Sequence, residues 1–233
     1  MSGILYGVGL GPGDPDLITV KSSRLISQAR VIAYPSLAGG ESFARSIAAD
    51  LISPDAEEIV MDVPMTVERA PAQAAYDIGA KNIAAVLDRG EDVVCLCEGD
   101  PFFYGSFMYL HARLVVDYQV EVVPGVTSIT ICAARAGMPL AARNERLTVL
   151  PGPLPAEELR ARIEGAESVA IMKVGRHLSK IRAVIADLGL TDKAAYIERA
   201  SLPDELVCPL AQAPETAPYF SMIILTKGAD PWL

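Results

Sequence analysis

The sequence predicts an α/β protein of two domains, an N-terminal domain with a mostly parallel sheet and a smaller C-terminal domain with a mixed sheet. Through the first half of the 233 residues, short apolar runs alternate with segments of helical periodicity, which is typical of a parallel sheet with helices on both faces. Past about residue 138, the segments 143–146 and 151–153 break this rhythm, and the later strands indicate some antiparallel pairing. The domains are therefore placed at 1–120 and 121–233, with the boundary between 118 and 145.

Apolar periodicity and capping residues predict the individual elements. Thr19 is a suitable N-cap, Asp88-Arg89-Gly90 closes the longest helix, and Pro35 is expected to end the second strand. In the N-terminal domain we expect strands at 4–6, 31–34, 57–61, 92–97 and 120–123, and helices at 20–29, 41–50, 71–89 and 105–116. In the C-terminal domain we expect strands at 147–150, 168–172, 194–198 and 220–226, and helices at 155–163 and 178–188.

Composition narrows the class of protein. The net charge is −9 and no basic run is present, which disfavours a nucleic-acid partner. The apolar runs are too short for a membrane span and the N-terminus does not resemble a signal peptide, so we expect a cytoplasmic protein. The four cysteines are not spaced as metal ligands and the chain has only two histidines, so we expect buried free thiols and no metal site.

The first strand runs into a glycine-rich loop over residues 7–15. The loop fits neither the G-x-G-x-x-G dinucleotide fingerprint, because Pro12 and Asp14 occupy its final-glycine positions, nor a P-loop, because no Gly-Lys-Ser/Thr follows. It has no Lys or Arg before Lys21, which argues against a phosphate cradle. A cationic ligand, or one bound through ribose, amide and apolar contacts, suits the loop better; a tight turn without a ligand is the alternative.

Two more loops follow strands in the same way, at 98–105 and 124–128. In open parallel sheets, ligands bind beyond the carboxyl ends of the strands. Gly99 allows close backbone approach, and Asp100 is able to accept hydrogen bonds from a ribose or an amino group. The hydroxyls of Thr127 and Ser128 suit either a ligand or the cap of the next helix. The three loops together predict one ligand site.

In order and spacing, these segments resemble the tetrapyrrole methylase family, the class III S-adenosylmethionine methyltransferases. The resemblance covers nearly the whole chain and rests on the motifs 8–14, 99–101 with 104–105, 124–128, Met172 at a strand end, and 198–201.

The resemblance implies a homodimer of two-domain α/β subunits, with S-adenosyl-L-methionine folded in a cleft between the domains and S-adenosyl-L-homocysteine as product. For Met172, core packing is the competing interpretation. Carried over by motif, the cofactor-binding residues are Leu10, Pro12, Glu98, Gly99, Asp100, Phe103, Thr127, Ser128, Met172 and, through its backbone, Ala200.

Within the family, residues 63–68, 98–106, 108–111 and 218–222 resemble the C-20 methyltransferases of cobalamin biosynthesis. This implies methyl transfer to C-20 of the tetrapyrrole precorrin-2, giving precorrin-3A; a cobalt-containing substrate stays open. Pro35 stands where uroporphyrinogen III methyltransferases carry an Asp, which weakens that assignment. A tetrapyrrole- or nucleotide-binding module without catalysis, and a family member acting on protein or RNA, are the other hypotheses.

The predicted methyl transfer also needs a base and a docking site for substrate carboxylates. The base stays unassigned among Glu98, Tyr104 and His111, and we expect His111 to be structural because it shares a helix face with apolar residues. A local basic rim is the hypothesis for the carboxylates, with a solvated surface role as the alternative for each member. Its candidates are Arg69, Arg143, Arg146, Arg176 and Arg199.

Overall fold

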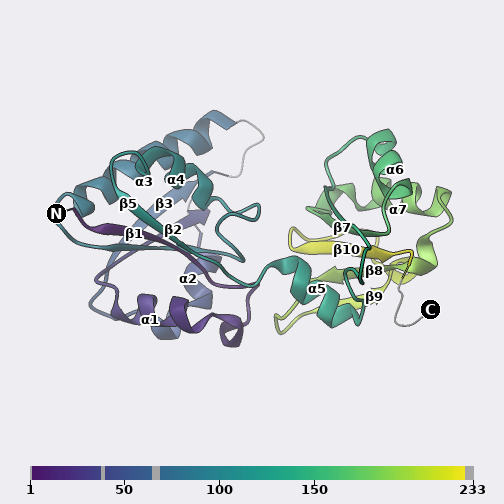
Figure 1. Cartoon of the computed structure of the whole chain (residues 1–233), viewed down its shortest axis with the longest axis horizontal. Coiled ribbons are helices and arrows are strands. Elements are labelled where there is room, and N and C mark those ends of the chain that lie inside the picture. The colour runs from purple at the N-terminus through teal and green to yellow at the C-terminus, as the bar shows by residue number, and fades with distance from the viewer. Residues whose placement is uncertain (1, 38–39, 65–68, 229–233) are drawn as a thin grey trace. The chain divides into compact units, whose positions relative to one another are not determined.

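The computed structural model describes residues 2–37, 40–64 and 69–228, with only the backbone of Arg69. The chain divides into two compact units, residues 1–127 and 128–233 (Figure 1). Among the described residues, no helix is both long and apolar enough to cross a membrane.

The first unit is built on a five-stranded, fully parallel sheet in the order β3-β2-β4-β1-β5. The strands are β1 (Ile4–Gly9), β2 (Val31–Leu37), β3 (Glu57–Val63), β4 (Val93–Cys97) and β5 (Gln119–Val123). The helices are α1 (Val20–Gln28), α2 (Phe43–Ile47), α3 (Arg69–Leu87) and α4 (Phe107–Leu114), with 3-10 turns η1 (Pro15–Leu17) and η2 (Ala49–Leu51). Because β4, β1 and β5 are neighbours, the loops that follow them leave the sheet side by side.

Helices cover both faces of this sheet, as the sequence predicts (Figure 1). The alternation of side chains along β4 sends Cys95 into the core under α3 and α4, and Leu96 into the core under α1 and α2. Both side chains are buried, so β4 is apolar on each face, as expected of a central parallel strand. Helix α1 begins as predicted, with the Thr19 side chain accepting from the Ser22 N–H.

The second unit has a mixed sheet in the order β6-β7-β10-β8-β9, which confirms the prediction of antiparallel pairing. Only β6 and β7 pair in parallel; β10 is antiparallel to β7 and β8, and β9 is antiparallel to β8. The strands are β6 (Leu147–Pro151), β7 (Ser168–Met172), β8 (Ala194–Glu198), β9 (Leu206–Pro209) and β10 (Ser221–Thr226). The helices are α5 (Ser128–Ala136), α6 (Ala156–Glu164) and α7 (Leu178–Asp187), with 3-10 turns η3 (Gly175–His177), η4 (Thr191–Lys193) and η5 (Leu210–Gln212).

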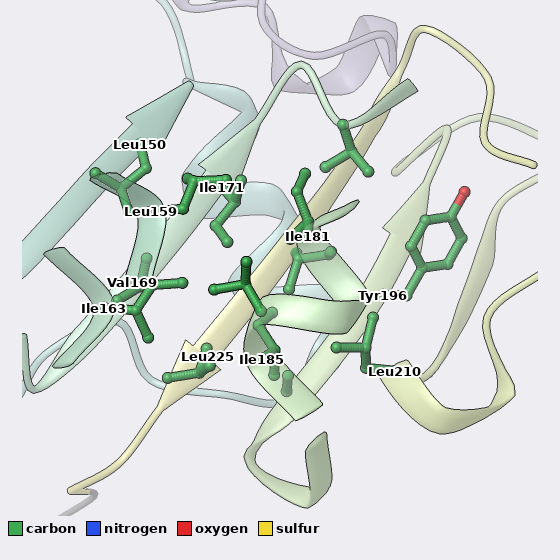
Figure 2. Close-up of a cluster of buried hydrophobic side chains, with 14 of the residues drawn as sticks. Leu150, Leu159, Ile163, Val169, Ile171, Ile181, Ile185, Tyr196, Leu210 and Leu225 are labelled. Atoms are coloured by element: carbon green, nitrogen blue, oxygen red, sulfur yellow. The ribbon is translucent and has the colours of Figure 1, made fainter. Parts of the chain in front are cut away.

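Helices α6 and α7 bury their apolar faces against one side of this sheet (Figure 2). Leu159 and Ile181 pack there with Ile171 of β7, all without exposed area. The ring of Tyr196 belongs to the same core, and its hydroxyl donates to the Glu198 carboxylate at 2.6 Å. Helix α5 contacts β8, β9 and β10.

The ends of the predicted elements shift by up to three residues, and α5 and β9 had no predicted range. The differences at β2 and β9 have a physical reason. Strand β2 was expected to end before Pro35 but continues to Leu37, paired with β3. Its pairing with β4 is confined to Ile32 and Ala33, so Pro35 has a strand on one side only. A proline is tolerated where a strand has a free side. Strand β9 was not predicted; it is a four-residue edge strand ending in Pro209, too short to show a period. The cysteines are free, with Cys95, Cys97 and Cys132 buried as expected and Cys208 half-buried.

Candidate functional site

The loops after β1 and β4 meet through backbone hydrogen bonds. Gly11 and Gly99 form an isolated antiparallel bridge, in which the Gly99 N–H donates to the Gly11 carbonyl at 2.7 Å and the Gly11 N–H donates back at 3.2 Å. The Leu10 N–H donates to the Cys97 carbonyl at 2.9 Å. Both glycines have positive φ, +80° at Gly11 and +62° at Gly99, which only glycine adopts without strain. The predicted convergence of these two loops is therefore confirmed.

The Asp100 side chain joins the third loop to this pair. Its Oδ1 accepts from the N–H groups of Phe102 and Phe103 at 2.9 and 3.0 Å, and its Oδ2 accepts from the Gly125 N–H at 3.1 Å. One carboxylate thus shapes its own turn and holds the loop after β5. Three of its acceptor positions are used within the protein, so its first role is to organise the loops.

Close packing of backbone explains two of the glycines. A Cβ on Gly125 would lie 2.1 Å from the Gly99 carbonyl oxygen, and a Cβ on Gly9 would lie 2.5 Å from the Gly125 nitrogen. The Gly9 carbonyl is satisfied by the buried Ser22 hydroxyl at 2.9 Å. Gly99 differs, because a Cβ there would meet nothing within 4 Å. We define Gly9, Gly11, Gly99, Asp100 and Gly125 as the three-loop junction.

The other predicted contact residues of the first unit differ in exposure. The Leu10 side chain is fully buried in the core under α1 and α2, so only its backbone is able to touch a ligand. Pro12, Phe103 and Thr127 are half-buried, and Glu98 is exposed. Although exposed, the Glu98 carboxyl is partly desolvated by the protein around it, which raises its pKa.

The remaining base candidates lie close to the 98–105 loop. His111 is half-buried and packs edge-on against Phe102 and Phe107, with ring centroids 5.0 and 6.3 Å apart, which agrees with a structural role. Tyr104 is exposed and adopts φ 57°, an uncommon conformation for a non-glycine residue. Glu98 is the candidate that directly follows a strand of the junction.

In the second unit, Met172 and Ala200 lie at one edge of the mixed sheet. Strands β7 and β8 both run antiparallel to β10, so their carboxyl ends share that edge. Met172 ends β7, is half-buried, and its carbonyl accepts from the Gly152 N–H at 2.7 Å. Ala200 follows β8 between Arg199 and Ser201, which have φ of 48° and 70°. Ser128 is half-buried and is the first residue of α5.

Residues 4–214 match the family model described as Tetrapyrrole (Corrin/Porphyrin) Methylases. This chain belongs to the tetrapyrrole methylase family. A precorrin-2 C(20)-methyltransferase from Sinorhizobium is 41% identical over 99% of each chain. The cobalt-precorrin-2 C(20)-methyltransferase of Salmonella typhimurium is 32% identical over 97% of this chain and 98% of its own. The structure of uroporphyrin-III C-methyl transferase from Thermus thermophilus, complexed with S-adenyl homocysteine, matches with a TM-score of 0.68 at 25% identity, covering 97% of this chain and 92% of that one.

The arginines of this tetrapyrrole methylase divide by their partners. Arg146 precedes β6, at the edge opposite Met172, and is ion-paired with Glu167. Arg199 is paired with Glu198 and Asp204. Arg176 is exposed in η3, four residues past the end of β7, and its Nε donates to His177 Nε2 at 3.5 Å.

The structure also bears on other sequence candidates. Arg143 has φ 47° and follows α5 in the second unit. The side chain of Arg69 and residues 65–68 of the 63–68 stretch lie outside the described residues. Among the described residues, no group of three or more His, Cys, Asp or Glu side chains is placed to hold a metal ion.

Two features near the predicted site residues could not be found from the sequence. Gly9 and Gly125 must lack a Cβ because their loops pack closely, and that packing depends on which strands are neighbours. The sequence showed only that both positions lie in turns, through a G-x-G and a Pro-Gly pattern. The contact of Arg135 with Glu205 joins residues 70 positions apart, and no local pattern announces it.

Proposed function

We propose that this protein transfers the methyl group of S-adenosyl-L-methionine to C-20 of precorrin-2, giving precorrin-3A in cobalamin biosynthesis. The observation that carries the proposal is the 41% identity to the Sinorhizobium precorrin-2 C(20)-methyltransferase over 99% of both chains. The second candidate reaction is methyl transfer to the same carbon of cobalt-precorrin-2, which the 32% identity to the Salmonella relative supports.

The three-loop junction suits S-adenosyl-L-methionine. The loops 10–14 and 98–105 have no Lys or Arg, which fits a ligand with a sulfonium centre and no phosphate. A Cβ on Gly99 would meet nothing within 4 Å, so the space beside this residue is open and a ligand is able to reach its backbone groups. When bound, the cofactor supplies an electrophilic methyl group. The Thermus relative crystallised with S-adenyl homocysteine supports this choice.

We propose cofactor contacts in each unit, as the family motifs imply. The first unit contributes the Leu10 backbone, Pro12, Glu98, Gly99, Asp100, Phe103 and Thr127, and the second contributes Ser128, Met172 and the backbone of Ala200. Their work is to orient the reactants and to exclude water, because the substrate carbon is already electron-rich through conjugation with pyrrole nitrogens. The rigid junction serves this work, since Asp100 fixes three N–H groups of two loops.

Glu98 is the proposed base that removes the proton after methyl transfer. It directly follows β4 beside Gly99, and its partly desolvated carboxyl has a raised pKa, which makes it a stronger base than an ordinary carboxylate. His111 is less suited because two aromatic rings pack around it.

Arg176 is the proposed partner of the substrate carboxylates. It follows β7 at the same edge of the sheet as Met172. Desolvation lowers the pKa of the neighbouring His177, and the positive charges of Lys180 and Arg176 lower it further. Two cations, Arg176 and Lys180, therefore act at this place in a protein of net charge −9. Tyr219 and Phe220, 59% and 40% exposed just before β10, offer apolar surface to the macrocycle.

The decisive experiment is incubation with methyl-labelled S-adenosyl-L-methionine and either metal-free or cobalt-containing precorrin-2, followed by mass spectrometry and NMR. We expect one new methyl group at C-20. Methylation at another carbon would reassign the specificity, and absence of product from both substrates would refute the proposal. Cofactor and tetrapyrrole binding without any transfer would favour the binding-module alternative.

We further propose a cytoplasmic homodimer. Ile78 on α3 and Met108 and Tyr109 on α4 are 60%, 37% and 41% exposed, apolar surface that a second subunit would cover. Free cysteines suit a reducing compartment. Light scattering at micromolar concentration would test the dimer, and a monomer mass would contradict it.

A further inference from the structure

The loop after β8 holds its backbone in an uncommon conformation. Arg199 and Ser201, on either side of Ala200, adopt φ of 48° and 70° although neither is glycine. Non-glycine residues persist in this region only where their surroundings fix them, and such positions cluster at ligand sites.

Backbone hydrogen bonds account for its two ends. The Arg199 N–H donates to the Phe220 carbonyl at 2.8 Å, and the Leu202 N–H donates to the Arg199 carbonyl at 2.9 Å. The middle of the loop depends on a side chain, because the Ser201 N–H donates to Glu205 Oε2 at 2.6 Å. That hydrogen bond sets the peptide between Ala200 and Ser201.

The same carboxylate is tied to a second element. Glu205 accepts from Arg135 Nε at 2.7 and 2.9 Å on its two oxygens, and the Arg135 Nη2 lies 2.7 Å from Oε1. The Glu205 side chain is only 14% exposed, so these charge-assisted bonds are shielded from solvent on one side. Arg135 lies in the last turn of α5, the helix that begins at Ser128.

We propose that Glu205 is a positioning residue for the cofactor site, one that touches no cofactor atom. It fixes the backbone at Ala200 through Ser201 and fixes helix α5, with Ser128 at its start, through Arg135. Two of the proposed cofactor contacts thus share one carboxylate. This inference rests on the proposed function, because it assumes that Ala200 and Ser128 meet the cofactor.

The test compares S-adenosyl-L-homocysteine binding by calorimetry in wild type and three variants of the full chain. We expect Glu205→Ala to raise Kd about tenfold or more, and Glu205→Gln, which keeps an oxygen acceptor for the Ser201 N–H, to raise it about threefold. Glu158→Ala, which breaks an Arg–Glu pair on the exposed face of α6, should leave Kd unchanged. Initial rates of Glu205→Ala should show a raised KM for the cofactor with kcat within about twofold of wild type.

Each outcome decides a separate claim. If wild type binds no S-adenosyl-L-homocysteine, the proposed function fails. If wild type binds it and Glu205→Ala binds it equally well, only the positioning role is overturned. If Glu205→Ala does not fold, Arg135→Met replaces it, since this change leaves the Ser201 bond and removes the link to α5; a Kd raised about threefold supports the role, and an unchanged Kd overturns it.

Discussion

Gly125→Ala tests the three-loop junction most directly. The new Cβ would lie 2.1 Å from the Gly99 carbonyl oxygen and 2.9 Å from the Gly9 Cα, and both neighbours are backbone. Ordinary contact begins at 3.4 Å, so Gly99 and Gly125 must separate by about 1.3 Å. That shift stretches the Asp100–Gly125 hydrogen bond from 3.1 Å and disturbs the Gly11–Gly99 bridge.

The magnitude follows from these losses. Overpacking of a close contact costs about 1–3 kcal/mol, and weakening of the stretched hydrogen bond from Gly125 to Asp100 adds about 1 kcal/mol. We expect the free energy of unfolding of the first unit to fall by about 2–4 kcal/mol. Because the loops must move apart at the proposed cofactor site, the Kd for S-adenosyl-L-homocysteine should rise about tenfold or more.

Urea unfolding and calorimetry measure the two effects. Gly165→Ala is the matched control, because its Cβ would make only an ordinary 3.7 Å contact and its φ is −82°; it should change stability by less than about 0.5 kcal/mol. An unchanged unfolding free energy together with an unchanged Kd in Gly125→Ala would refute the junction argument. If that variant does not fold, Asp100→Asn, whose amide nitrogen is unable to accept from Gly125, should weaken binding in the same direction.

Glu98→Gln should lower kcat about tenfold or more if Glu98 is the base, and remove the acid limb of the pH–rate profile. It should also raise the thermal midpoint at neutral pH, because the raised pKa means that ionised Glu98 destabilises the fold above its ordinary titration range; an unchanged kcat contradicts the role. Arg176→Ala should raise KM for precorrin-2 about fivefold, whereas Arg146→Ala should not; equal effects would show a general charge effect. Arg45→Met should lower the free energy of unfolding at neutral pH by about 1–2 kcal/mol, because Arg45 holds the pKa of Glu58 at about 2, below 4.5. The stability that this pair contributes is present above pH 4.5 and is lost as the pH falls toward about 2. The difference in unfolding free energy between Arg45→Met and wild type, followed by urea unfolding, should therefore shrink over this pH range, and a pH-independent difference would contradict the argument.

Much of the fold was predictable because it is encoded locally. The start of α1 after Thr19 and the strand 168–172 depend on capping and on apolar runs, and the structure has both where the sequence predicts them. Element ends were less certain. Pro35 lies inside β2 because the pairing of a neighbouring strand, a tertiary feature, decides whether a proline is tolerated there.

The candidate site shows the same division. The sequence by itself determined where the glycine-rich loops stand, which cofactor class their motifs resemble, and that they leave the same edge of a parallel sheet. Only the tertiary structure showed that the Leu10 side chain is buried, that Asp100 binds the Gly125 N–H, that Arg146 lies at the opposite edge from Met172, and that Glu205 reaches Arg135. The physical reason is range: propensity, capping and turn chemistry act over a few residues, whereas the Asp100 and Glu205 contacts cross 25 and 70 positions and exist only after the strands have taken their order.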